Sequence, residues 1–187
     1  MALGHLPTAR DAGGRFGQRT IGGPSMSVKG YSRMQIRLHW AVFGLVVVQF
    51  LFGNGMGHAF GQYMDTGEKG FSLLVGLHIL IGLSILVLAF WRLGLRFLHG
   101  VPAPDPAHSP AQVLLARVIH GGLYVLMVAL PVSGMLAWSL GSGLAAGLHA
   151  GFRVILVLLI LLHVAAALMG QYIKKDGTLT RMLKAEG

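Results

Sequence analysis

Two histidines, His149 and His163, lie 14 residues apart on one long apolar segment, in positions suited to binding metal. Fourteen residues are close to four turns of an α-helix, so both imidazoles return to nearly the same helix face, about 21 Å apart along the axis. The residues between them include an unbroken apolar run, 154–162. Because imidazole is a common metal ligand, this spacing suits two metal centres arranged one above the other along one helix. The alternative is a membrane helix that carries a histidine near each end without consequence.

Four apolar runs of helix length position these histidines. The runs cover residues 36–56, 71–91, 118–140 and about 147–173. Each has roughly the ~20 residues needed to cross ~30 Å of hydrocarbon. Charged residues make up only 11% of the chain and hydrophobic residues 54%, whereas soluble domains are roughly 25% charged. We therefore predict an all-α integral membrane protein, a four-helix bundle whose third helix is kinked by Pro131.

Lys and Arg residues are unevenly distributed among the connections. Thirteen of the fifteen lie before or at the start of the first run (through Arg37), between the second and third runs, or after the fourth. Only Lys69 and Arg153 fall on the other side. The positive-inside rule then predicts that both termini are cytoplasmic. The net charge of +9 does not indicate nucleic acid as a partner, because the basic residues flank apolar runs and do not cluster on a soluble fold.

The chain is expected to form one domain with two tails. Residues 1–30 are rich in Gly and Arg without a hydrophobic period, which predicts a disordered basic tail, and no apolar segment of a secretory signal follows its arginines. Met26 is a second candidate for the first residue of the natural chain. The four-helix domain is predicted over 31–183, with residues 184–187 as a C-terminal tail.

Two connections have a distinctive composition. The segment Gly100–Pro110 contains four prolines and predicts an extended connector. His99, just before it, and His108, within it, are expected to be solvated. The connection around Trp138–Leu148 is short and contains no Lys or Arg.

Five histidines fall within or at the edges of the four runs: His39, His78, His120, His149 and His163. The alternating direction of the helices assigns each to a level of the bundle. The outer level contains His78 and His149, and the inner level contains the other three. A six-coordinate b-type haem takes one axial ligand from each of two facing helices. The outer pair is then His78 with His149, and the inner pair joins His163 to either His39 or His120.

The absence of cysteine limits the type of haem. A chain with no Cys cannot attach a c-type haem or ligate an iron–sulfur cluster through thiolates. Any haem would be held by axial side chains and packing. Three arginines lie within a turn of a histidine and are placed to pair with haem propionates: Arg37 near His39, Arg117 near His120 and Arg153 near His149. The positive-inside rule explains Arg37 and Arg117 equally well, but not Arg153.

Several motifs occur in an order that resembles the prokaryotic cytochrome b561 family. They are Tyr31-Ser-Arg-Met-Gln-Ile-Arg-Leu-His39-Trp40, His78-x-x-x-Gly82, Trp91-Arg92-Leu93, Ala116-Arg-Val-Ile-His120-Gly-Gly-Leu-Tyr124, and Lys175-Asp176-Gly-Thr-Leu-Thr-Arg181-Met182. The resemblance covers roughly residues 31–183.

The resemblance implies a membrane cytochrome with two haem b groups. By resemblance, His39 with His163 ligates the inner haem iron and His78 with His149 the outer, while His120 lies in the second sphere or near a propionate. Family members pass electrons in the bacterial inner membrane between periplasmic donors and the quinone pool. One type oxidises superoxide and reduces ubiquinone. Lipid, quinone, a periplasmic donor and a second copy in a homodimer are therefore the expected partners.

Two alternative functions stay open from the sequence. The chain could be the cytochrome b membrane subunit of a multi-subunit dehydrogenase or hydrogenase, rather than an oxidoreductase in its own right. It could also be a non-redox membrane protein whose histidines shuttle protons or bind a metal.

Overall fold

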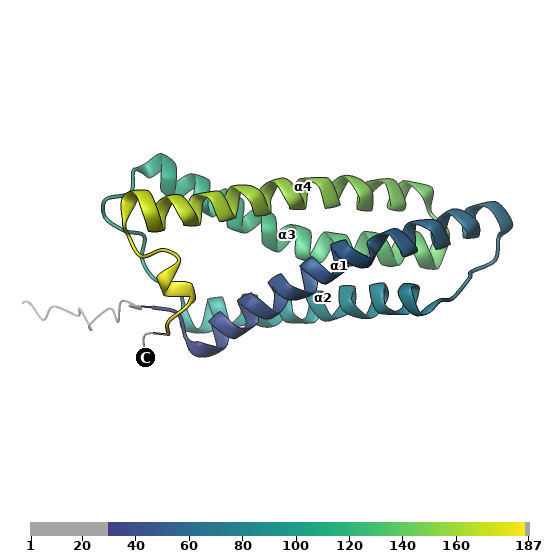
Figure 1. Ribbon diagram of the computed structural model, residues 1–187, viewed down its shortest axis with the longest axis horizontal. Coiled ribbons are helices and arrows are strands. Elements are labelled where there is room, and N and C mark those ends of the chain that lie inside the picture. The colour runs from purple at the N-terminus through teal and green to yellow at the C-terminus, as the bar shows by residue number, and fades with distance from the viewer. Residues whose placement is uncertain (1–29, 186–187) are drawn as a thin grey trace, which may run out of the picture.

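The computed structural model describes residues 30–185, which are helical and contain no strand (Figure 1). The helices are α1 Arg33–Thr66, α2 Leu73–His99, α3 Pro110–Leu140 and α4 Gly143–Leu168, followed by a π-helical turn, η1 Met169–Lys174, and a 3-10 turn, η2 Thr180–Met182. All four long helices are apolar enough to cross a membrane, with η1 extending α4. The predicted all-α fold with four membrane-spanning helices is confirmed. The expected N-terminal tail lies outside the described residues except for Gly30, and Met26 lies outside them too.

A serine begins each long helix and sets its first residue. The side chains of Ser32, Ser72, Ser109 and Ser142 each accept a hydrogen bond from a backbone N–H in the first turn. At Ser32 and Ser109 the glutamine three residues on bonds back to the serine N–H, which completes a capping box. Ser32 and Ser109 lie several residues before the apolar runs that follow them, so α1 and α3 begin earlier than hydrophobicity alone predicts.

The first helix is longer than the span predicted for it. It continues past Met56 to Thr66 and ends at Gly67, which adopts the left-handed conformation with φ 74°. Its 34 residues are about 51 Å long, more than the ~30 Å of a hydrocarbon core. One end of α1 therefore extends past the core.

The extension of α1 packs against the junction of α3 and α4. Only Gly141 and Ser142 connect these two helices. Gly141 has φ 62°, and a Cβ there would lie 2.8 Å from the Tyr63 hydroxyl oxygen, so both its conformation and the available space favour glycine. The Lys69 ammonium group also donates to the Ser139 carbonyl at 3.0 Å. These contacts hold together the far end of the bundle, which we define as the end opposite the described termini.

The helices pack in chain order, α1 on α2, α2 on α3 and α3 on α4. A small core of Val42, Ile85, Ala89 and Met127 joins the first three helices. Large apolar side chains elsewhere face outwards, as expected for a lipid-facing surface. Helices α1 and α4 diverge towards the end that carries the described termini (Figure 1). An apolar hollow of about 190 Å³ lies between them, lined by Phe50 and by residues 153, 154, 157 and 158.

The C-terminal segment folds back over the end of the bundle where α1 begins (Figure 1). The indole N–H of Trp40 donates to the Met182 carbonyl at 2.9 Å. His108, from the connector between α2 and α3, donates from Nε2 to Asp176 Oδ2 at 2.9 Å. The expectation that His108 is solvated is therefore wrong, because the returning segment supplies a carboxylate that local sequence does not reveal. His99 is exposed, as expected.

Candidate functional site

Four of the five histidines form two facing pairs at two levels of the bundle. His78 of α2 faces His149 of α4 with ring centroids 6.2 Å apart, and we name this the far level. His39 of α1 faces His163 of α4 with centroids 6.1 Å apart, at the terminal level. Each pair joins α4 to a different helix. The separation of the two levels along α4 follows from the helix rise and is about 21 Å.

The centroid distances match those of two imidazoles on opposite sides of one metal ion. Two metal–nitrogen bonds of about 2 Å, plus about 1 Å from each nitrogen to its ring centre, put such centroids roughly 6 Å apart. His120 also contacts His163, but its ring centroid lies only 5.0 Å away. That spacing is about one ångström too short for a metal ion between the two rings.

The far level has the surroundings expected of metal-ligating histidines. His149 Nδ1 donates to the Leu130 carbonyl at 2.9 Å, which orients the ring and leaves Nε2 free. Gly134 lies against the same ring, where a Cβ would come within 3.1 Å of it. His78 Nδ1 is buried and has no hydrogen-bond partner among residues 30–185. Since an unsatisfied buried nitrogen is costly, a ligand or metal that supplies its partner fits this position.

The terminal level has three histidines and one arginine. His120 Nδ1 donates to the Ala116 carbonyl at 2.6 Å, so this ring is tied to its own helix. The Arg92 guanidinium donates to His39 Nδ1 at 3.1 Å. Arg92 was not predicted as a site residue from the sequence. The available signal was its position at the end of an otherwise uncharged apolar run.

A family model described as prokaryotic cytochrome b561 matches residues 30–185. The chain belongs to the prokaryotic cytochrome b561 family. It is therefore a multi-pass bacterial membrane protein, a b-type cytochrome that binds haem b and acts in electron transfer. The imidazoles of each facing histidine pair are of the type and at the spacing that would hold a haem iron, so the residues present fit this cofactor.

This chain matches three relatives over nearly the whole length of each relative. Cytochrome b562 of Cereibacter sphaeroides is 40% identical over 157 residues, which cover 83% of this chain and 96% of the relative. The probable superoxide oxidase CybB of Yersinia pestis is 32% identical over 176 residues, which cover 83% of this chain and 96% of the relative. Cytochrome b561 homolog 1 of Escherichia coli K12 is 28% identical over 174 residues, which cover 82% of this chain and 96% of the relative.

The three arginines expected near haem propionates, Arg37, Arg117 and Arg153, are all exposed in this b561-family chain. Arg153 lines the hollow between α1 and α4 together with Phe50. It also lies within electrostatic reach of both histidines of the far level. Arg37 makes no side-chain hydrogen bond or ion pair within residues 30–185.

Proposed function

We propose that this chain is a dihaem cytochrome that carries electrons across the bacterial inner membrane, between a donor and the quinone pool. The observation that supports it is the presence of two imidazole pairs, at 6.1 and 6.2 Å, at two levels of one bundle. Two levels about 21 Å apart span much of a ~30 Å hydrocarbon core. That is the arrangement needed to relay an electron from one side to the other.

In this proposal, His39 and His163 ligate the iron at the terminal level, and His78 and His149 ligate the iron at the far level. Haem b held by these residues would supply a one-electron iron couple. The task of the chain is then to hold the haems in place, orient their histidine ligands and bury them away from water. The Leu130 carbonyl fixes the His149 ring, and the apolar side chains of α4 between the levels exclude water. Arg153 and His120 are proposed to lie beside propionates, at the far and terminal levels respectively, and Arg37 stays a further candidate.

Quinone is the proposed membrane-soluble partner, and the donor at the far end is proposed to be a periplasmic protein or superoxide. A relative that is 32% identical is named a probable superoxide oxidase, which supports superoxide. The charge at the far end does not favour it. The connection between α3 and α4 consists of Gly141 and Ser142, and exposed Asp65 and Glu68 offset Lys69 nearby, so no strong positive field would attract an anion.

The first experiment counts the haems. A pyridine haemochrome assay on the purified full chain is expected to give two haem b per chain. Fewer than one would refute the dihaem proposal and favour a non-redox role for the histidines.

Single histidine variants test the pairing. We expect His78→Ala and His149→Ala to remove the same haem, and His39→Ala and His163→Ala to remove the other, each leaving about one haem per chain. His58→Ala is the matched control, since His58 is exposed on α1 and bonds only to Asn54 within its own helix. The assignment is wrong if His39→Ala keeps both haems while His120→Ala loses one.

Reduction of the isolated chain separates an autonomous oxidoreductase from a subunit. Rapid haem reduction by quinol or by superoxide would support direct electron exchange with that donor. If neither reduces the haems, but they remain reducible by dithionite, a subunit of a larger dehydrogenase is the better description.

A further inference from the structure

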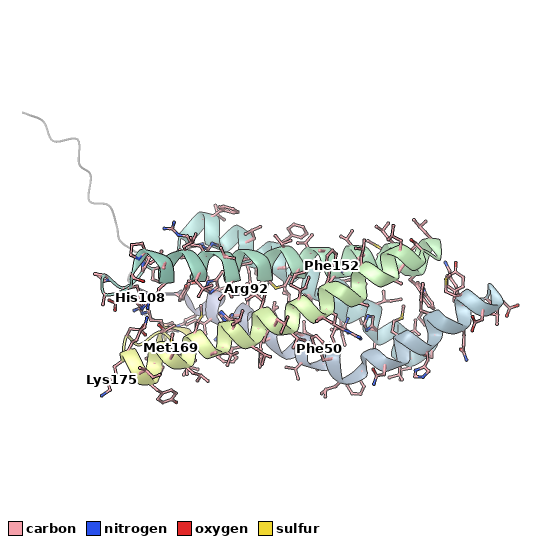
Figure 2. All side chains as sticks on the ribbon, turned by 90° about the horizontal axis from the view of Figure 1, so that it is seen from above. Phe50, Arg92, His108, Phe152, Met169 and Lys175 are labelled. Carbon is pink, nitrogen blue, oxygen red and sulfur yellow. The ribbon has the colours of Figure 1, made fainter. Side chains whose placement is uncertain are left out.

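Arg92 is a half-buried guanidinium within the helical bundle. Its side chain lies between the helices in Figure 2, in contrast to Lys175 on the outer rim. One terminal nitrogen donates to His39 Nδ1 at 3.1 Å. Its central carbon also lies 5.7 Å from the centre of the Tyr124 ring, as in a cation–π contact. Arg92 therefore touches a proposed haem ligand directly.

No carboxylate neutralises this charge within residues 30–185. The acidic residues there are Asp65, Glu68, Asp105 and Asp176, and the one ion pair among the described residues joins Asp176 to His108. Arg92, Arg96 and Arg181 all lie close enough to the Tyr31 hydroxyl for their charges to lower its pKa. Arg96 and Arg181 therefore add positive charge near Arg92. A partly buried guanidinium is strongly stabilised by a carboxylate, which it binds through two parallel hydrogen bonds.

Tyr31 does not supply the missing negative charge. Burial raises the pKa of its phenol above the ordinary value, and the neighbouring arginines, Arg96 foremost, offset this only in part. The phenol therefore stays neutral at physiological pH. Among residues 30–185, the positive cluster of Arg92, Arg96 and Arg181 therefore has no carboxylate that forms an ion pair with it.

The contact between Arg92 and His39 is incompatible with the usual form of a ligating histidine. A guanidinium can only donate, so His39 Nδ1 must present a lone pair to it. A histidine that ligates a metal through one nitrogen normally carries a proton on the other and donates it to an oxygen. Arg92 must therefore move away from Nδ1 when His39 ligates iron through Nε2.

We propose that Arg92 exchanges partners on haem binding, leaving His39 Nδ1 and pairing with a propionate carboxylate of the haem at the terminal level. This inference rests on the proposed function, because it requires a haem between His39 and His163. It assigns a role in haem binding to Arg92, which was not among the site residues predicted from the sequence. It also gives the unneutralised charge an anionic partner that arrives with the cofactor.

The test compares two haems that differ only in the propionates. Haem-free full-length chain in detergent is titrated with haem b and with haem b dimethyl ester, whose carboxylates are blocked. We expect Arg92→Gln to weaken haem b binding at one of the two sites by about 10- to 100-fold, while the two chains bind the ester equally. Arg92→Lys should restore part of the affinity, since it keeps the charge but loses the planar fork. Arg33→Gln, an exposed arginine at the same end, is the control.

Redox titration supplies a second readout. Because a positive charge favours the reduced haem, Arg92→Gln should lower the midpoint potential of one haem and leave the other unchanged, and Arg92→Lys should lower it less. Equal losses with haem b and with the ester, or no loss with either, would overturn the proposal. These outcomes are distinct from failure of the proposed function, in which the unaltered chain itself would bind no haem between His39 and His163.

Discussion

His149 shows how one residue can be held rigidly in a membrane helix. Its Nδ1 donates to the Leu130 carbonyl at 2.9 Å, and the Ser133 hydroxyl lies 3.3 Å from the same nitrogen. Gly134 faces the ring from the same helix, α3. The imidazole is thus confined between a hydrogen bond and a backbone surface, so it cannot easily give way to an added atom.

We predict that Gly134→Ala disturbs the far haem specifically. The added Cβ would lie 3.1 Å from two atoms of the His149 ring, closer than ordinary van der Waals contact between carbons, about 3.5–4.0 Å. The expected result is a loss of affinity of several-fold or more for one haem, measured by haem titration, with the other haem retained. Gly121→Ala is the matched control on α3, since a Cβ there has nothing within 4 Å. Both variants gain the same helix propensity, so equal behaviour would contradict the prediction.

The C-terminal segment is an element held by polar contacts and not by a core. The Asp176 carboxylate is 6% exposed and accepts hydrogen bonds from His108 and from the side chain and backbone of Thr178. Arg181 donates to the Asp176 carbonyl at 2.9 Å. Figure 2 shows His108 at the same end of the bundle as Met169 and Lys175. Asp176 therefore joins the segment after α4 to the connector before α3.

We predict that this segment detaches in acid. Burial alone raises the pKa of Asp176, but the hydrogen bonds from Thr178 and His108 outweigh it, so the pKa lies below its ordinary value. The stabilisation is then complete above the unfolded pKa of about 4 and is lost as the pH falls through the lower folded value. Hydrogen exchange of residues 176–184, corrected for the intrinsic rate, should show protection at pH 7 that disappears below about pH 4.

Asp176→Asn should show the loss already at pH 7. Replacing a charged acceptor removes roughly 1.5–3 kcal/mol of hydrogen bonding, so exchange of the segment should be about tenfold faster or more. Asp105→Asn is the control, because Asp105 accepts only from the nearby Ala107 N–H. Unchanged protection in Asp176→Asn would mean that Trp40 and the other contacts hold the segment without the carboxylate.

At the scale of the whole molecule, charge and helix count define a direction. Both described ends of the chain lie at one end of the bundle (Figure 1). The exposed cations Lys174, Lys175 and Lys184 are at that end, whereas the far end carries Asp65 and Glu68 near Lys69. The positive-inside rule then predicts that the end with the termini faces the cytoplasm.

Cysteine labelling tests this orientation directly, because the natural chain contains no Cys. Glu68→Cys should react with a membrane-impermeant maleimide in intact spheroplasts, and Lys184→Cys only in inverted vesicles. The unaltered chain provides the unlabelled control. The reverse pattern would place the far level of histidines on the cytoplasmic side and reverse the proposed electron path.

The number of helices, the family and the two histidine levels could all be predicted from the sequence alone. These are local or periodic properties, since a run of about 20 apolar residues spans a bilayer whatever surrounds it, and topology then orders the histidines by depth. Tertiary structure decided what depends on helix rotation and on contacts distant in sequence. It placed the ring centroids of His39 and His120 at 6.1 Å and 5.0 Å from that of His163. It also turned Arg92 towards His39 and brought Asp176 to His108. Packing determines which face each helix turns inwards, and a uniformly apolar helix carries little record of that face in its sequence.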